Sequence, residues 1–366
     1  MLGVSGYCRV AMKTTYIRAA VRELSGYVPG EQPQSRHVIK LNTNENPYPP
    51  SPQVIAAIAE VASAELRLYP DPLAVEVRRR AAARYNVDAA QVLVGNGSDE
   101  LLALIMRACV GVGTRVAYAI PTYSLYETLV ALQEGESVQV PYGPDWALPA
   151  ALFGADAAVI VVCHPNSPSG TAVPVTTIEA LAREATGLVV VDEAYVDFAD
   201  ESALPLLREL DNVVVLRSFS KSFSLAGVRA GLAIGPAELI AALCRIKDSY
   251  NVSRMSLAAA AAALDDYDWM EGNVRRVRAT RVRLFDGLTG LGFQVTPSQA
   301  NFVFARRPGE DMGPLHEQLR TQGILVRHFP APQLRDGLRI TVGTEEETAA
   351  LLEALARLMG QAQPCC

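Results

Sequence analysis

One lysine flanked by serines lies between two short apolar runs, within the stretch 218–229. Apolar runs of that length predict buried strands, so Lys221 is expected on a loop at the edge of a sheet. A primary amine held there can condense with an aldehyde to a Schiff base, and pyridoxal phosphate is the aldehyde cofactor that uses lysine in this way. Ser218 and Ser220 offer hydroxyl donors and Arg229 a planar permanent charge, which a phosphate ester requires.

In isolation, a serine-rich segment with one lysine and one arginine is more typical of a solvated loop than of a cofactor site. A second stretch, upstream in the sequence, favours the cofactor site. Asp192 closes the apolar run 188–191 and is expected at a strand end. A carboxylate there can ion-pair with a pyridinium nitrogen and make the ring an electron sink. Tyr195, three residues later, is a candidate for the ring hydroxyl. A turn acid and a half-buried aromatic remain the ordinary alternatives for these two residues.

Taken together, the segments 192–195 and 220–229 resemble those of the fold-type I pyridoxal-phosphate aminotransferases, and most of all the histidinol-phosphate aminotransferase branch. The resemblance runs from about Tyr16 to Leu358. It implies an α/β fold, with a large domain built on a mostly parallel seven-stranded sheet covered by helices and a smaller α+β C-terminal domain. The expected division is an N-terminal arm at 1–40, a large pyridoxal-phosphate-binding domain at 41–253 and a small domain at 254–366.

Local patterns place the elements that would hold these residues. Strands and helices alternate through the first two-thirds of the chain, which predicts a largely parallel sheet with ligands at the strand ends. Helices are expected over 53–66, 73–85, 101–109, 237–248, 254–264, from there to 287, and over 312–322 and 345–358. Strands are expected over 92–94, 115–119, 158–163, 188–191, 213–216, 230–234, 294–295, 301–305, 324–326 and 338–342.

A glycine turn before one of these helices supplies a candidate anion site. Gly97, Ser98 and Asp99 follow a short strand and lead into the helix at 101–109. Free backbone N–H groups and the positive end of the helix dipole then point at one spot, although ordinary helix capping gives the same pattern. The resemblance implies that this turn holds the cofactor phosphate together with Ser218, Ser220 and Arg229.

Other contacts rest on the resemblance alone. It implies that Tyr123 stacks on the pyridine ring and that the loop with Asn166 and Ser167 reaches the ring oxygen. The family commonly has two asparagines before the second proline of that loop, and this chain has Asn166 followed by Ser167. Either Ser167 makes a shorter contact or Asn166 turns inward. Tyr69 is expected to reach the phosphate of a partner subunit, which implies a homodimer.

Four residues are candidates for contacts to substrate. Tyr27 lies in a turn of the N-terminal arm, where a surface tyrosine is an equal alternative, and Asn44 lies in a polar loop that resembles the family's substrate-lining loop. Arg339 alternates with apolar neighbours on a strand, which puts it on the opposite face from them. The resemblance assigns to Arg339 the anionic group of the substrate, and Arg327 is a weaker candidate for the same pocket.

Net charge, cysteine spacing and the length of apolar runs argue against several other classes of protein. The net charge of -6 among 366 residues, without a basic stripe, argues against a nucleic-acid-binding protein. The six cysteines show neither metal-ligand nor disulfide spacing, and no apolar run is long enough to cross a membrane. With no leader pattern, a cytoplasmic protein is expected, and Met12 is a possible start. The arginine run 275–283 is expected to form the solvated face of a long helix.

The sequence therefore predicts an aminotransferase of histidine biosynthesis, which uses pyridoxal 5'-phosphate and no metal. It would exchange the amino group of L-histidinol phosphate with 2-oxoglutarate, giving imidazole acetol phosphate and glutamate. Lys221 is the expected base and acid, and Asp192 would keep the ring nitrogen protonated. An aromatic amino acid aminotransferase on the same scaffold, a related decarboxylase or oxidase, and a ligand-binding protein without catalysis remain as alternatives.

Overall fold

A computed structural model describes residues 16–24, 26, 30–33 and 38–360. The strands are β1 (Ile39–Lys40), β2 (Val92–Gly95), β3 (Arg115–Ile120), β4 (Glu136–Pro141), β5 (Val159–Cys163), β6 (Leu188–Asp192), β7 (Val213–Ser218), β8 (Gly231–Ile234), β9 (Gln294–Thr296), β10 (Phe302–Arg306), β11 (Ile324–Leu325), β12 (Arg327–His328) and β13 (Gly337–Thr341).

The α-helices are α1 (Ala19–Glu23), α2 (Pro52–Val61), α3 (Val75–Tyr85), α4 (Ser98–Cys109), α5 (Leu125–Leu132), α6 (Val175–Glu184), α7 (Ala237–Ile246), α8 (Arg254–Asp265), α9 (Tyr267–Gly290), α10 (Gly313–Thr321) and α11 (Glu345–Leu358). Short 3-10 helices are η1 (Ala64–Arg67), η2 (Ala89–Gln91), η3 (Ala150–Leu152), η4 (Val196–Phe198) and η5 (Leu204–Arg208). No helix in this described part is long and apolar enough to cross a membrane.

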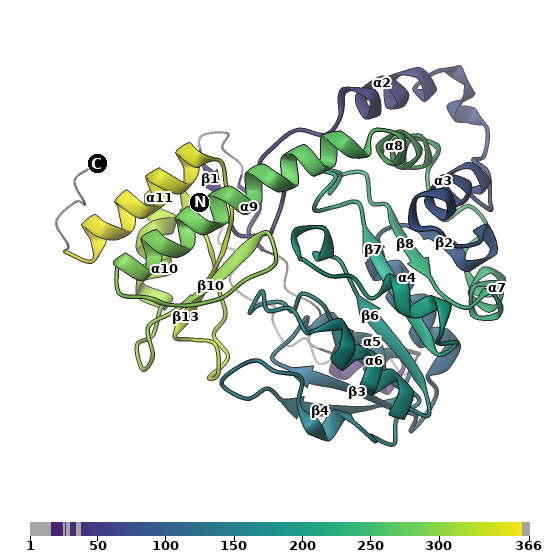
Figure 1. Ribbon diagram of the computed structural model, residues 1–366, viewed down its shortest axis with the longest axis horizontal. Coiled ribbons are helices and arrows are strands. Elements are labelled where there is room, and N and C mark those ends of the chain that lie inside the picture. Colours follow the sequence, from purple (N-terminus) through teal and green to yellow (C-terminus); the bar gives the residue numbers. More distant parts are fainter. Residues whose placement is uncertain (1–15, 25, 27–29, 34–37, 361–366) are drawn as a thin grey trace.

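A seven-stranded sheet forms the larger body, with strand order β2-β8-β7-β6-β5-β3-β4. Strands β3 to β7 pair in parallel, whereas β8 runs antiparallel to both β2 and β7. This confirms the expected mostly parallel sheet of seven strands. Strand β4 and helix α6 lie in stretches for which no element was predicted. The right-hand part of Figure 1 shows this sheet with its helices.

Helices cover both faces of the large sheet because its strands are apolar on both sides. Along β5, Val159 and Val161 face the cluster that includes side chains of α4, α5 and α7. Ile160 and Val162 face the opposite cluster, which includes side chains of α6 and η5. Because β5, β6 and β7 pair in parallel, their carboxyl ends lie at the same end of the sheet, and the candidate site residues follow these strands.

The smaller sheet has the order β12-β13-β10-β9 and is antiparallel throughout. Helices α9 and α10 pack against this sheet and α11 packs against these two helices, while α9 extends to α8, as Figure 1 shows. Helix α8 itself packs against α2 and α3. A smaller α+β region is thus confirmed, while the exact division at 253 stays a prediction. The first strand, β1, pairs in parallel with β11 and so ties residues 39–40 to this region.

One expectation for α9 is wrong. The arginines of the run 275–283 were all expected on the solvated face, but Arg281 points inward and donates from Nη1 to the carbonyls of Phe198, at 3.2 Å, and Ala300, at 2.7 Å. Burial lowers the pKa of Arg281 to about 10. It occupies a position on the helix stripe that includes the buried Val277 and Leu284. Its two carbonyl partners join the loop after β6 to the small domain.

Candidate active site

Lys221 lies on the loop between β7 and β8, as predicted. Its Nζ donates to the carbonyl oxygen of Thr43 at 3.2 Å and lies 5.6 Å from the centre of the Tyr195 ring. Burial, and then the positive charge of Arg339, lower the pKa of Lys221 to about 8, although Glu45 acts in the opposite direction. Because an amine with this pKa is partly neutral near pH 7, Lys221 can act as a nucleophile or a base.

Asp192 is the last residue of β6 and pairs in register with Leu216 of β7, the strand that leads to Lys221. Its Oδ2 accepts a hydrogen bond of 2.6 Å from the hydroxyl of Tyr126, and its Oδ1 accepts one of 3.3 Å from the backbone N–H of Ala194. Burial raises the pKa of Asp192 to about 6, while the bond from Tyr126 lowers it. A buried carboxylate of this kind calls for a cationic partner.

Tyr126 is a site residue that the sequence reasoning missed, since only core packing was considered for it. It is fully buried, and burial raises the pKa of its phenol well above the usual value, so it stays protonated as a donor. Its ring packs edge-on against Tyr123, with 5.7 Å between ring centres. Tyr126 lies in the first turn of α5, and its acidic partner is 66 positions away in the sequence, so no local signal could have identified it.

Tyr195 lies beside Lys221 and is held by polar and apolar contacts. Its hydroxyl accepts a hydrogen bond of 3.0 Å from Nδ2 of Asn44, and its ring packs edge-on against Phe302, with ring centres 5.0 Å apart. Burial raises the pKa of Tyr195 to about 12. The structure thus brings the predicted Asn44, Tyr195 and Lys221 together.

The turn before α4 has the features of an anion site. Gly97 has a φ of 87°, and no side chain caps the helix that begins at Ser98. A Cβ on Gly97 would lie 2.6 Å from Nη2 of Arg229, so only glycine leaves this space open. The first N–H groups of α4 therefore face a small cradle beside a guanidinium, which favours a phosphate.

Around this cradle the predicted side chains contact one another. Arg229 donates from Nη1 to Ser220 Oγ at 3.3 Å and pairs with Asp99 at 3.5 Å. Ser218 Oγ accepts the backbone N–H of Ser220 at 3.2 Å, and Tyr123 donates to Asp99 at 3.2 Å. Two hydroxyls, one guanidinium and a helix start thus meet at one edge of the sheet.

The loop after β5 carries Asn166 and Ser167. The side-chain oxygen of Asn166 accepts from Thr122 at 2.7 Å, and its Nδ2 donates to Ser169 Oγ at 3.0 Å. Asn166 is thus held by its own surroundings, whereas Ser167 Oγ accepts a 2.9 Å bond from Arg339. Their contacts to a ring oxygen stay a prediction.

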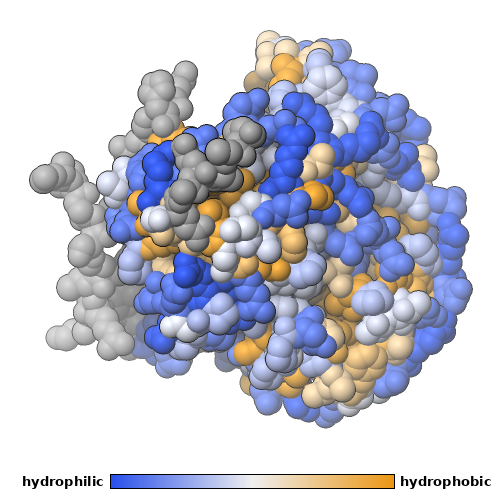
Figure 2. Space-filling view, turned by 60° about the vertical axis from the view of Figure 1, so that its left-hand side comes forward, coloured by the Kyte–Doolittle hydropathy of each residue, from blue (hydrophilic) through white to orange (hydrophobic). Residues whose placement is uncertain are grey.

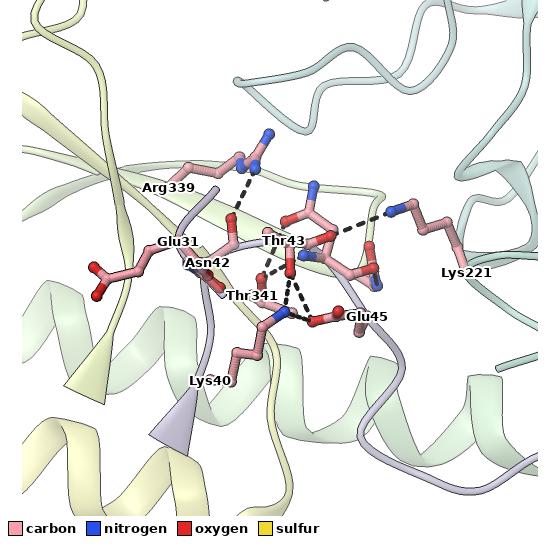
Figure 3. Close-up of polar contacts among 10 residues, drawn as sticks. Glu31, Lys40, Asn42, Thr43, Glu45, Lys221, Arg339 and Thr341 are labelled. Atoms are coloured by element: carbon pink, nitrogen blue, oxygen red, sulfur yellow. Dashed lines mark hydrogen bonds and ion pairs between the residues drawn. The ribbon is translucent and has the colours of Figure 1, made fainter. Parts of the chain in front are cut away.

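Arg339 on β13 pairs in register with Arg327 on β12. Besides Ser167, Arg339 contacts the carbonyl of Asn42 at 3.1 Å, and its guanidinium carbon lies 5.5 Å from the centre of the Phe329 ring. The same ring lies 5.4 Å from the guanidinium of Arg327. Figure 3 shows Arg339 and Lys221 approaching the same segment from opposite sides.

Two predicted residues are not part of this cluster. Tyr69 is 75% exposed and stacks on Tyr250, with 4.2 Å between ring centres, on the outer surface. Its predicted role concerns a partner subunit, so it stays a prediction. Tyr27 lies outside the described residues. A cavity of about 640 Å³ lies elsewhere, lined by the segments 144–148, 171–174 and 294–299 together with Thr177 and Arg306.

Comparisons with known proteins agree with this geometry. Residues 36–355 match the family described as aminotransferase class I and II. The chain is 45% identical over 348 residues to histidinol-phosphate aminotransferase 1 of Trichormus variabilis, covering 94% of this chain and 99% of that protein. It is 48% identical over 343 residues to histidinol-phosphate aminotransferase 1 of Bradyrhizobium diazoefficiens, covering 93% and 98%.

A solved structure shows the same fold. The crystal structure of histidinol-phosphate aminotransferase from Sinorhizobium meliloti in complex with pyridoxal-5'-phosphate superposes with a TM-score of 0.87 at 27% identity. The match covers 96% of this chain and 99% of that chain. The expected fold-type I architecture is thereby confirmed.

Proposed function

The chain belongs to the class I and II aminotransferases, which use pyridoxal phosphate, and from this premise we propose that it transfers the amino group of L-histidinol phosphate to 2-oxoglutarate. The similarity to histidinol-phosphate aminotransferases extends over nearly the whole chain at 45–48% identity. The observation that carries the proposal is the reactive amine of Lys221, with its pKa lowered to about 8 at the strand ends that also carry Asp192.

The residues present fit pyridoxal phosphate. We assign its phosphate to the start of α4 at Gly97, Ser98 and Asp99, with Ser218, Ser220, Arg229 and the partner's Tyr69 as further contacts. The donor set suits a phosphate dianion, and the space above Gly97 would be filled by any Cβ. We assign the ring nitrogen to Asp192, the ring face to Tyr123, and the ring oxygen to Tyr195 and the loop with Asn166 and Ser167.

When bound, the cofactor supplies an electron sink for the electrons released at the substrate's α-carbon. The chain's own residues do the rest. Lys221 removes the proton at that carbon through its neutral amine. The ammonium group so formed then donates this proton to C4′ of the cofactor. Asp192 keeps a negative charge beside the ring nitrogen, and Tyr126 holds that carboxylate in place through a 2.6 Å bond.

Arg339 is the proposed anion clamp for substrate. Its guanidinium lies beside Ser167 and Asn42 at the site, on the strand that faces Lys221 across the segment 40–46. One planar fork can serve the carboxylate of glutamate or a phosphate ester. Arg327, Asn44 and Tyr27 remain proposed contacts of the same pocket.

A homodimer is part of the proposal. Exposed apolar side chains gather in the 66–75 stretch and near α8: Leu66, Leu68, Tyr69, Leu73, Val75, Tyr250 and Met255. On the face in Figure 2, apolar residues gather in several separate areas, with hydrophilic residues between them. An exposed apolar group of this size favours a protein partner. The proposed compartment is the cytoplasm, as composition predicts.

A half-reaction screen tests the proposed substrate. Cofactor-loaded protein is mixed separately with histidinol phosphate, phenylalanine, tyrosine, histidine and glutamate, and loss of the cofactor absorbance band is followed. Histidinol phosphate and glutamate should react fast. If histidinol phosphate is inert and phenylalanine reacts fast, the proposed substrate is wrong and the chain is an aromatic amino acid aminotransferase. If the absorbance band is lost but the amine is not returned to a keto acid, the chain is a decarboxylase or an oxidase.

A further inference from the structure

The segment 40–46 passes between the small domain and the Lys221 loop and contacts both. On one side, Nδ2 of Asn301 donates to the carbonyl of Asn44 at 2.9 Å, and Thr341 Oγ1 accepts the N–H of Asn44 at 3.0 Å. On the other side, Nδ2 of Asn46 donates at 3.1 Å to the carbonyl of Lys221. The segment therefore connects the small domain to the backbone of the reactive lysine.

At the centre of the segment, the Thr43 carbonyl accepts the hydrogen bond from the Lys221 amine. The side chain of Thr43 belongs to a closed triad: its Oγ1 donates to Oε2 of Glu45 at 2.6 Å, and Nζ of Lys40 contacts both Thr43 Oγ1 and Glu45 Oε2. Figure 3 shows the triad directly below the contact between Lys221 and Thr43. The Lys40 side chain is 20% exposed and that of Glu45 is 40% exposed, so the pair is partly shielded from water.

Charges face the Lys221 amine from several elements. Arg339 and Arg229 lower the pKa of Lys221 beyond the effect of burial, whereas Glu45 and Asp99 raise it. Asp99 is already paired with Arg229. Burial raises the pKa of Glu45, but the hydrogen bonds from Lys40 and Thr43 and the charges of Lys40 and Lys221 lower it overall. Glu45 is therefore ionised and is the acid that opposes Arg339 at the amine.

We propose that Glu45 is a positioning residue for Lys221: Lys40 and Thr43 fix its carboxylate, which in turn fixes the carbonyl that holds the amine and keeps a negative charge opposite Arg339. Through this arrangement the amine has a defined place whenever it is not bonded to the cofactor. The inference rests on the proposed function only in that Lys221 is the reactive amine.

Two substitutions break the ion pair between Lys40 and Glu45, and we expect them to shift the pKa of Lys221 in opposite directions. Glu45→Gln removes the negative charge, so the pKa of Lys221 should fall by about 0.5 to 1 unit, less than for a directly contacting charge. Lys40→Met leaves the carboxylate of Glu45 without its counter-charge while Thr43 still holds it, so the pKa of Lys221 should rise. The matched control is Glu310→Gln, which breaks the ion pair with Arg307 in the turn that follows β10.

The main readout does not require the loaded enzyme. Full-length, cofactor-free protein is labelled with an amine-reactive reagent across a pH series, and mass spectrometry measures labelling of the peptide that carries Lys221. A thermal melt of each variant at pH 7 verifies folding. In loaded protein, the acid limb of the pH profile of kcat should move in the same direction as the labelling curve, with little change in KM.

Opposite shifts in the two variants, beyond that of the control, would support the inference. Shifts of the same sign, or none, would overturn it, because a purely structural triad loses the same contact in both variants. The outcome is separable from that of the proposed function. If the labelling curves shift as predicted while histidinol phosphate fails as a substrate, only the substrate assignment fails.

Discussion

Replacement of Tyr126 by phenylalanine removes the one side-chain hydroxyl that contacts Asp192 among the hydrogen bonds of the described residues, at 2.6 Å. A buried hydrogen bond to a charged group contributes about 1.5–3 kcal/mol. Since about 1.4 kcal/mol corresponds to one pKa unit, the pKa of Asp192 should rise from about 6 by roughly 1 to 2 units. The variant then requires a higher pH to ionise the acid that binds the cofactor's ring nitrogen.

The assay is the affinity for pyridoxal phosphate between pH 5.5 and 9, roughly the range around these pKa values. Binding should weaken below a pH that lies about 1 to 2 units higher in Tyr126→Phe than in the unmodified protein, with the two affinities converging at the alkaline end. Tyr118→Phe is the matched control, since Tyr118 is also buried and packs edge-on against Tyr126 but contacts Gln139. Identical pH profiles for the two variants would refute the reasoning.

Three further predictions follow from burial and packing. Lys221→Met should abolish transamination yet stabilise the cofactor-free chain at pH 7 by roughly 3 kcal/mol. The reason is that burial lowers the pKa of Lys221 to about 8, so keeping this amine protonated in the folded state lowers the free energy of unfolding below that pH. In thermal melts, the contribution of Lys221 to stability should rise between about pH 8 and 10.5 in the unmodified protein and be absent from the variant. Gly97→Ala should weaken binding of pyridoxal phosphate about tenfold or more by titration, whereas Gly113→Ala, which shares the positive φ but meets nothing within 4 Å, should not. Arg281→Met should lower the unfolding free energy by roughly 2–3 kcal/mol in denaturant titrations, against under about 1 kcal/mol for the exposed, ion-paired Arg283→Met, and should leave cofactor affinity unchanged.

The positions of Asp192 and Lys221 could be predicted from the sequence because the ends of apolar runs indicate where buried strands end. Asp192 closes the apolar run of β6, and Lys221 follows that of β7, so two neighbouring parallel strands place both residues at one edge. The glycine turn at Gly97 was recognisable for the same reason, since it separates a strand from a helix. The family resemblance then supplied the roles, which the fold alone does not fix.

Side-chain partners across long separations were not predictable. Tyr126 contacts an acid 66 positions away, and no local pattern shows that contact. The inward direction of Arg281 was hidden by its charged neighbours, although its position on the apolar stripe of α9 gave a signal. The triad of Lys40, Thr43 and Glu45 is local, but its meaning depends on Lys221, which only the folded chain brings to Thr43.

Chemical labelling of the reactive amine tests the role of Lys221 most directly. Protein loaded with pyridoxal phosphate is reduced with borohydride, digested, and mapped by mass spectrometry. We expect a pyridoxyl group on Lys221 and on no other lysine. A label on a different lysine, with Lys221 unmodified in protein that retains the cofactor, would contradict this role.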